Sequence, residues 1–355
     1  MAIIDKPTDH FTTFLWTGDG TSPKSFTGVG FQADMMWSKI RTDGHQHNIV
    51  DTVRGVNQRL ISTNLTNAED TTCTHGHFDS LDSDGFTITG AGGYWNVNTN
   101  AKNYVGWLWK AGGTAVSNTD GTITSSVSAN TDSGFSIVSY TGNATNGATV
   151  GHGLASVPTM LIGKDLSDGS SWGIWHKNLS GATYRLSFNT DAQSDDSFLF
   201  GGSGAVLPTS TVFTLGSGGG LNGVNANIVY CFAEKQGFSK FGSYTGNGST
   251  DGTFVYTGFK PAFLIIKKTS ATAPWDMFDD TRNVINPVNS RLHPNASDTE
   301  FTNSAMNIDF VSNGFKIRTT DNELNTSGAT YIYMAFAEQP FVTSTDNNSI
   351  PATAR

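Results

Sequence analysis

The chain uses one unit of about a hundred residues three times, and this repetition restricts its fold more than any other feature. The best-preserved copy reads FGSYTGNGSTDGTFVYTGFKPAFLIIKK around Tyr244, and weaker copies surround Tyr140 and Trp16. The spacing from Tyr140 to Tyr244 equals the spacing from Phe232 to Phe336, so the second and third copies follow one another without a linker. Repetition of this kind predicts tandem units of one architecture.

Five landmarks align between the copies and define the units. In the first copy, His47 and Val50 replace an aromatic pair that the other two copies retain. The landmarks are the aromatic-Thr-Gly turns beginning at Trp16, Tyr140 and Tyr244; the apolar strands closed by Lys39, Lys164 and Lys267; the pairs Trp172–Trp175 and Trp275–Phe278; the Arg-Leu pairs at 59–60, 185–186 and 291–292; and the closing strands carrying Trp109, Phe232 and Phe336.

The landmarks give the expected organisation of the chain. The stretch after the first copy accounts for its greater distance from the second, and it has almost no bulky apolar side chains. We expect a leader at 1–10, a divergent first repeat at 11–113, a linker or surface hairpin at 114–132, repeats at 133–237 and 238–342, and a tail at 343–355.

Each copy consists of short runs with alternating apolar residues, such as NGFKIRTT and TYIYMAFAE, separated by turn clusters such as TGNGSTDG. Charged residues make up only 14% of the chain while Gly reaches 40, and the carboxylates are nearly all Asp, which favours turns over helices. The pattern predicts an all-β protein of three tandem antiparallel β-sandwich domains, jelly-roll or concanavalin-like, each with its own core. In the closing strand of the third copy, Ile332, Met334 and Phe336 should face that core.

The net charge and the composition of individual segments exclude several classes of partner and location. A net charge of −9 argues against nucleic acid and against an anionic membrane surface as partners. The sequence MAIIDKPTDHF lacks the apolar region of a signal peptide, and no window predicts a membrane span. Cys73 and Cys231 lie in different repeats, so we expect free thiols in a protein folded in a reducing cytoplasm.

Four histidines form two His-x-His pairs in the first copy. His45 with His47 and His75 with His77 would each place two imidazoles on one face of a strand, and Cys73 is close in sequence. Such pairs are candidate ligands for a metal ion, and two polar surface loops are the alternative. No other cofactor is expected.

Carboxylates and tryptophans supply the other candidates. Asp279 with Arg282 repeats the spacing of an Asp and an Arg in the first copy, where a loop-fixing ion pair is the leading interpretation and ligand binding the alternative. Trp172, Trp175 and Trp275 could stack on sugar rings or pack in the core. No catalytic nucleophile, zinc-protease or phosphate-loop motif occurs in the sequence, so we expect a protein that is not an enzyme.

The stretches GFSIVSYTGNATNGATVGHGL, YCFAEKQGFSKFGSYTGNGSTDGTFVYTGFKPAFLIIKK, SNGFKIR and YIYMAFAEQP carry a family likeness. Through them the chain resembles repeat-built, tail-fibre-like or virion structural proteins of tailed bacteriophages, especially those of marine bacteria. The resemblance covers residues 114–341 most strongly and the first copy more weakly. It implies a concanavalin-like sandwich and a virion location, with folding in the host cytoplasm, and it supplies no catalytic residue.

These observations lead to one expected function and two alternatives. We expect an adsorption module of a tail or head fibre, whose partners are other virion proteins and a host cell-surface glycan. The first alternative is a capsid or tail decoration protein, and the second is a polysaccharide depolymerase. Fibre proteins are commonly trimers, so we also expect a homo-oligomer. The connections that differ between copies should carry recognition, with the partner site on the loops of copies two and three and attachment to the virion on copy one.

Overall fold

A computed structural model describes residues 3–57, 61–73, 76–90 and 97–341. The regular structure of these residues is almost entirely antiparallel strand, with a short 3-10 helix η1 (Pro7–Asp9) and a single helical turn α1 (Asn322–Asn325). The predicted all-β class is therefore confirmed. No helix in this part of the chain has the length and apolar character needed to cross a membrane.

The same four-stranded order occurs in three sheets, one in each predicted repeat, and the strand bounds are as follows. Repeat 1 (residues 11–113) has the order β1 (Phe11–Thr17), β7 (Asn103–Trp109), β3 (Met35–Ile40), β4 (Asn48–Asp51). Repeat 2 (133–237) has β10 (Phe135–Thr141), β17 (Ala226–Phe232), β12 (Met160–Asp165), β13 (Gly173–His176). Repeat 3 (238–342) has β18 (Ser239–Thr245), β26 (Thr330–Pro340), β20 (Phe259–Lys268), β21 (Trp275–Asp279).

Smaller sheets and ribbons complete the repeats. Repeat 1 adds a sheet of β2 (Lys24–Thr27), β6 (Gly85–Thr89) and β5 (His77–Asp82), and repeat 3 adds β19 (Phe254–Tyr256), β25 (Gly314–Ile317) and β24 (Ile308–Val311). Repeat 2 pairs β11 (Thr149–Gly151) with β16 (Val212–Thr214). Two-stranded ribbons join β14 (Tyr184–Arg185) to β15 (Ser194–Asp195) and β22 (Ser290–Arg291) to β23 (Phe301–Thr302).

The stretch between the first two repeats is a hairpin that belongs to a sheet. Strands β8 (Val116–Asn118) and β9 (Ser125–Asn130) pair with each other, and β9 continues along β10. Of the two alternatives for residues 114–132, the hairpin is the one observed. It extends the main sheet of repeat 2 to six strands.

The lysine landmark marks equivalent positions in the three sheets. Lys39, Lys164 and Lys267 lie on β3, β12 and β20, opposite Val105, Ile228 and Ile332 of the closing strands. Each ammonium group is buried and donates to two backbone carbonyl oxygens. Burial lowers the pKa of all three amines, to about 8 for Lys39 and Lys267.

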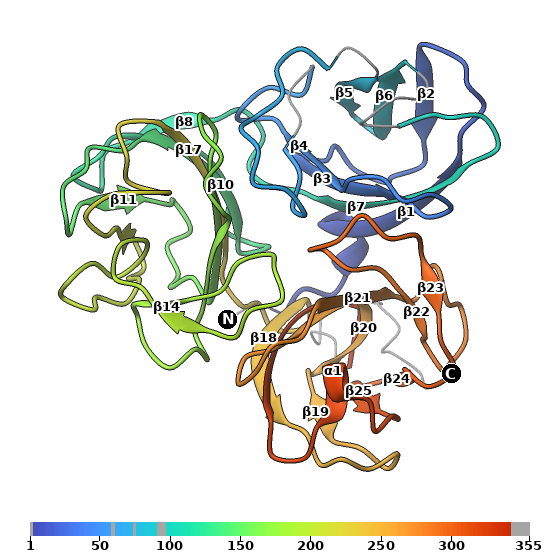
Figure 1. Ribbon diagram of the computed structural model, residues 1–355. Helices are drawn as coiled ribbons and strands as arrows, with labels where there is room; N and C mark the ends of the chain where they lie inside the picture. The colour runs from blue at the N-terminus through green and yellow to red at the C-terminus, as the bar shows by residue number, and fades with distance from the viewer. Residues whose placement is uncertain (1–2, 58–60, 74–75, 91–96, 342–355) are drawn as a thin grey trace.

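The three main sheets pack on one another around a shared core (Figure 1). Phe336, expected to belong to a private core of repeat 3, stacks on Phe11 of repeat 1 at 5.0 Å between ring centroids and meets Phe232 of repeat 2 at 6.1 Å. The prediction of a separate core for each repeat was therefore wrong for this face of the sheets. The cause is the number of apolar residues on both faces of each main sheet, which one partner sheet could not cover.

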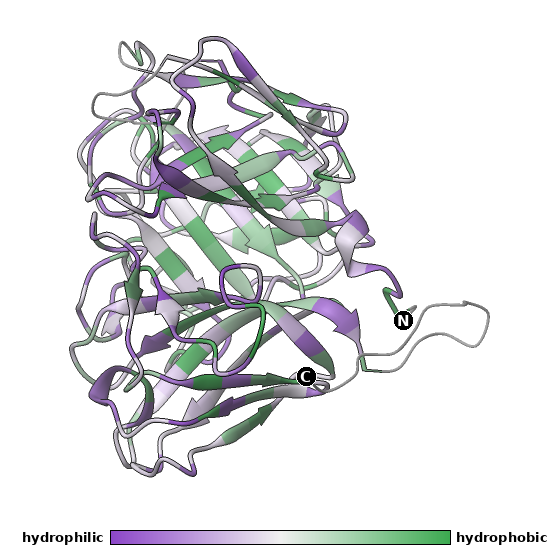
Figure 2. Cartoon of the chain, turned by 90° about the vertical axis from the view of Figure 1, so that its right-hand side faces the viewer, coloured by the Kyte–Doolittle hydropathy of each residue, from purple (hydrophilic) through white to green (hydrophobic). Residues whose placement is uncertain are grey.

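Alternation along the strands divides the residues between two cores. Ile332, Met334 and Phe336 face the shared core, as their spacing predicted, while Tyr331 and Tyr333 of the same strand face the core inside repeat 3. Repeat 1 has an inner core of its own in the same way. Figure 2 shows apolar residues on the strands and polar residues in the peripheral loops.

Two sets of buried hydrogen bonds connect the repeats in a ring. In the first set, equivalent side chains at the start of β4, β13 and β21 donate to a backbone carbonyl of a neighbouring repeat: His47 Nε2 to His293 O at 3.0 Å, Trp172 Nε1 to Ser62 O at 2.9 Å, and Trp275 Nε1 to Ser187 O at 2.8 Å. Each repeat donates once and accepts once, which is the contact pattern of a closed threefold ring.

The second set lies four residues further along the same strands. Tyr230 Oη donates to Asp51 Oδ2 at 2.8 Å, Trp107 Nε1 donates to Asp279 Oδ2 at 3.0 Å, and His176 Nε2 donates to Tyr333 O at 3.3 Å. His176 occupies the position of Asp51 and Asp279 in the other repeats. It faces the closing strand β26 of repeat 3, which has Met334 at the position of Tyr230 in repeat 2 and Trp107 in repeat 1. A methionine cannot donate to a carboxylate, so the replacement of Asp by His matches its partner.

Candidate functional site

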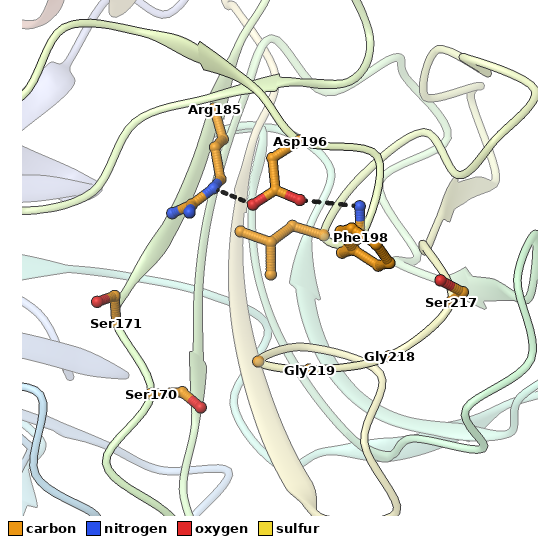
Figure 3. A pocket seen from close by; sticks show the side chains of 10 residues that line it. Ser170, Ser171, Arg185, Asp196, Phe198, Ser217, Gly218 and Gly219 are labelled. Carbon is orange, nitrogen blue, oxygen red and sulfur yellow. Dashed lines mark hydrogen bonds and ion pairs between the residues drawn. The ribbon is translucent and has the colours of Figure 1, made fainter.

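The main candidate site is a pocket of about 540 Å³ in repeat 2, at the open end of its sandwich (Figure 3). Its volume lies in the range usual for small-ligand sites. The walls come from the loop before β13, the β14–β15 ribbon and the loop after β16, and the lining residues are Ser170, Ser171, Arg185, Asp196, Phe198, Leu199 and 217–220.

An ion pair forms one wall of the pocket. Arg185 Nε donates to Asp196 Oδ2 at 2.5 Å, and Arg185 Nη1 donates to Ser187 Oγ at 3.0 Å. Ser187 Oγ in turn donates to Trp172 O at 2.7 Å, so the guanidinium group is anchored to the buried frame of the repeat. The Arg185 and Asp196 side chains remain 29% and 20% exposed, so both present polar atoms to solvent.

Phe198 stands beside this ion pair with 60% of its surface exposed. Its backbone N–H donates to Asp196 Oδ1 at 3.0 Å, which fixes the ring next to the carboxylate. The following residue, Leu199, also lines the pocket but is buried. A second hollow of about 680 Å³ lies against Asp196 and Phe198 on the side of Thr183 and Ser203. The ring therefore separates two adjoining hollows.

The glycine run Gly218–Gly220 closes the opposite side. All three residues have positive φ angles, of 147°, 64° and 62°, which side chains rarely tolerate. A Cβ on Gly220 would lie 2.8 Å from Leu199 Cδ2, whereas Gly218 and Gly219 have nothing within 4 Å of that position. This loop therefore keeps the pocket open and leaves its backbone accessible.

The groups in this pocket are suited to binding. An exposed aromatic face, a guanidinium, a carboxylate and several hydroxyls together match a ligand with one apolar face and hydroxyl groups at its edge. Hydrolysis of a glycosidic bond normally requires two carboxyl groups, and of the described residues lining this pocket Asp196 alone supplies one.

Comparison with known families gives one match. A family model described as a domain of unknown function, DUF7483, matches residues 6–340. The chain belongs to this family. The match spans all three repeats, in agreement with the core that they share. No curated protein and no solved structure matches the chain.

The tryptophans predicted to stack on sugars lie inside this DUF7483 fold. Trp172, Trp175 and Trp275 are 2%, 3% and 1% exposed. Their indole N–H groups donate to backbone carbonyls, and Trp172 and Trp275 do so across repeat boundaries. Their faces are covered by protein, so the core-packing alternative is the one observed.

Asp279 is also buried, and it belongs to an ion-pair network. It accepts from Arg282 Nε at 2.6 Å and from Trp107 Nε1, and Arg282 continues to Glu300 at 3.0 Å. Asp51, Arg54 and Glu69 repeat this arrangement in the first copy. The loop-fixing interpretation of the Asp/Arg spacing therefore describes both copies.

The histidines predicted as metal ligands do not form one group among the described residues. His47 is fully buried, with Nδ1 accepting from Trp37 Nε1 and Nε2 donating to His293 O, so both ring nitrogens are occupied. His77 pairs with Asp79 at 2.8 Å, and the carboxylate–histidine cluster found in the fold does not include His45, His47 or His77. His75 lies outside the described residues. Neither Cys73 nor Cys231 forms a disulfide bond, as predicted, and both side chains are buried.

The pocket residues were only partly visible in the sequence. The connection SDDSFLFGGSGAVLPTS was predicted to carry recognition, and it supplies Asp196 and Phe198. Arg185 stood out only as a repeat landmark. The Arg-Leu landmark of the first copy, placed at Arg59 and Leu60, needs correction. Ile61 forms a β-bridge with Ile49 in the same way as Leu186 does with Ile174, so Ile61 and not Leu60 is equivalent to Leu186. Arg59 and Leu60 themselves lie outside the described residues. An isolated Phe-Leu-Phe between Asp, Ser and Gly residues was the signal that could have revealed Phe198.

Proposed function

We propose that this chain is a non-enzymatic structural protein of a tailed-bacteriophage virion, and that repeat 2 binds a host cell-surface glycan. The observation that carries the binding role is the exposed Phe198 ring beside the Arg185–Asp196 ion pair. The virion context rests on the resemblance of the repeats to tail-fibre-like proteins.

The chemistry of the pocket favours a sugar over a charged ligand. The ring of Phe198 offers an apolar face on which the C–H face of a pyranose can pack. Arg185 and Asp196 carry opposite charges, so together they can donate to and accept from neighbouring hydroxyls without selecting an ion. The adjoining hollow gives space for a second residue of an oligosaccharide.

Binding of host polysaccharide by purified protein tests the proposal. Phe198→Ala should weaken binding at least about tenfold, which corresponds to about 1.4 kcal/mol. Phe254→Ala removes a ring that is 45% exposed on repeat 3 and serves as the matched control, expected to bind like the parent protein. Equal binding by the Phe198 variant and the parent would remove the pocket from the proposal. Release of reducing ends from the polysaccharide would instead favour the depolymerase alternative.

A second candidate, capsid or tail decoration, draws on the ring of three repeats. Pseudo-threefold arrangement within one chain suits attachment at a threefold position of a larger assembly. The number of copies per virion, measured by quantitative mass spectrometry, separates the two roles. Hundreds of copies would favour decoration, and a few dozen would favour a fibre.

A further inference from the structure

Repeat 3 contains a cluster with the composition of a metal site. Asp276 on β21, His293 two residues after the end of β22 and Glu323 in α1 each bring one ligand atom within 4.8 Å of the others. Three separate elements converge here although 16 and 29 residues of chain lie between the successive side chains. The cluster lies in a different repeat from the Phe198 pocket and uses different chemistry.

Two of the three side chains present buried atoms that lack a hydrogen-bond partner among the described residues. The Asp276 side chain is 1% exposed, and its Oδ2 has no hydrogen-bond partner among the described residues. The same is true of His293 Nε2, which lies 3.4 Å from Asp276 Oδ1, beyond the usual hydrogen-bond range. Buried carboxylate oxygens are almost always satisfied, so an unpartnered one next to an imidazole nitrogen indicates a ligand.

The remaining atoms of these side chains are held from outside the cluster. Arg291 Nη1 contacts Asp276 Oδ1 at 3.1 Å and also contacts Glu323 Oε2. His293 Nδ1 lies 3.4 Å from Asp298 Oδ2. Metal-binding residues are commonly oriented in this way, with a carboxylate behind the histidine and a hydrogen-bond donor behind the acidic ligand.

We propose that Asp276, His293 and Glu323 bind a divalent first-row transition ion, with Zn²⁺ the best match. One imidazole nitrogen and two carboxylate oxygens form a mixed donor set that suits Zn²⁺ or Mn²⁺, whereas Ca²⁺ and Mg²⁺ prefer oxygen alone. Asp276 and Glu323 carry two carboxylates, and Arg291 is the cation that contacts both of them. Three protein ligands leave a coordination position for water or for a donor group of a partner.

Repeat 2 lacks these ligands. Its equivalent positions are Gly173, Ser187 and Gly220, as the strand pairings, the matching hydrogen bonds of Tyr140 and Tyr244, and the bonds accepted by the Ser187 and His293 carbonyls establish. None of these three side chains is a metal ligand of the proposed kind. Repeat 2 therefore provides the substitutions for a test that preserves the frame.

Calorimetric titration of the whole chain with Zn²⁺ alone, and separately with Mn²⁺, tests the site. We expect one ion per chain, and a loss of affinity of at least tenfold in His293→Ser and in Glu323→Gln. The second variant changes a side chain that is 23% exposed and keeps its shape, so folding should be preserved, which thermal unfolding of each variant checks. His77→Ser is the matched control, because it removes a histidine paired with an aspartate in repeat 1.

Three outcomes would overturn the assignment. They are the absence of stoichiometric binding by the parent chain, unchanged affinity in a folded Glu323→Gln variant, and loss of binding in His77→Ser. Loss of binding in His77→Ser would indicate that the metal ion binds at the histidine pairs of repeat 1. Unchanged binding in the control together with loss in both cluster variants supports the site in repeat 3.

Discussion

Repeats 2 and 3 have equivalent frames but different contents at the same end of the sandwich. Arg185 and Arg291 occupy the same position, each on a two-stranded ribbon, and each has an exposed phenylalanine close by. In repeat 2 the arginine borders an open pocket with a glycine loop. In repeat 3 it lies between Asp276 and Glu323, whose carboxylates both contact its Nη1.

The difference arises from single residues, since the strands are unchanged. Asp276 replaces Gly173, and Glu323 replaces Gly220, so two glycines that pack closely against Leu199 in repeat 2 become carboxylates in repeat 3. The main sheets keep their order and pairing because their side chains are buried on both faces, whereas the ribbon and the loops are free to change. The repeats therefore share their buried frame and differ in the ribbons and loops at the end of the sandwich.

The largest expected effect concerns the buried Asp279–Arg282 ion pair of repeat 3. Repeat 2 has His176 and Leu179 at these two positions. Arg282→Leu leaves Asp279 buried without its counter-charge and should cost about 3–5 kcal/mol of unfolding free energy, measured by urea unfolding at pH 7. The double variant Asp279→His with Arg282→Leu copies repeat 2 and should be more stable than this single variant by about 1 kcal/mol or more. A single variant that costs less than about 1 kcal/mol would contradict the role given to the pair.

A smaller effect distinguishes the two equivalent arginines directly. Arg291→Met should cost about 2–4 kcal/mol, because the nearly buried Asp276 then faces Glu323 without a cation. Arg185→Met should cost within about 1 kcal/mol, since the Arg185–Asp196 pair is partly exposed. Both variants are measured by chemical unfolding in a chelator, which keeps metal ions out of the comparison. Equal costs would mean that the two positions are energetically alike.

The smallest effect is the pH dependence of the contact between repeats 2 and 3. Burial lowers the pKa of His176 to about 3, although its hydrogen bond to Tyr333 O opposes the shift. The folded state therefore keeps this histidine neutral, and its contribution to stability is full above about pH 6.5 and is lost as the pH falls below that value. At pH 5.5 the loss is about 1.4 kcal/mol relative to pH 7 and above.

His176→Gln retains a donor for the Tyr333 carbonyl and removes the titration. The difference in unfolding free energy between the parent and this variant should therefore change with pH between 7 and 5.5, while buried His47 and His152 contribute equally to both proteins. A difference that does not vary with pH would show that His176 is accessible to protons in the folded state.

The sequence predicted the frame well because the frame depends on local alternation. The phase of Ile332, Met334 and Phe336 and the register of Lys39 and Lys164 follow from the period of a strand. Alternation cannot tell which sheet covers an apolar face, so the shared core escaped prediction. For the same reason, Trp172 could be assigned either to a sugar site or to a core from its neighbours in sequence, and only packing between repeats decides between them.

The sequence indicated which loop carries the candidate site of repeat 2, but not which residues come together there. Variation between copies pointed to the loop that carries Phe198, because loops are less constrained by packing than strands. The distances that bring Arg185 to Asp196, or Asp276 to His293 and Glu323, depend on how ribbons and loops fold over the end of a sheet. A histidine spacing of two residues favoured the first repeat, where burial of His47 removes it from metal chemistry.

The ring of inter-repeat hydrogen bonds has a consequence for how such a protein can diversify. Three identical subunits would have to present the same loops three times, and any substitution would appear at every position around the axis. Covalent fusion gives each position its own sequence and also holds the neighbours at a high effective concentration without an assembly step. One gene can therefore hold three unlike loop surfaces at constant angles to one another, and each surface can evolve separately as long as the six donors of the ring keep their acceptors.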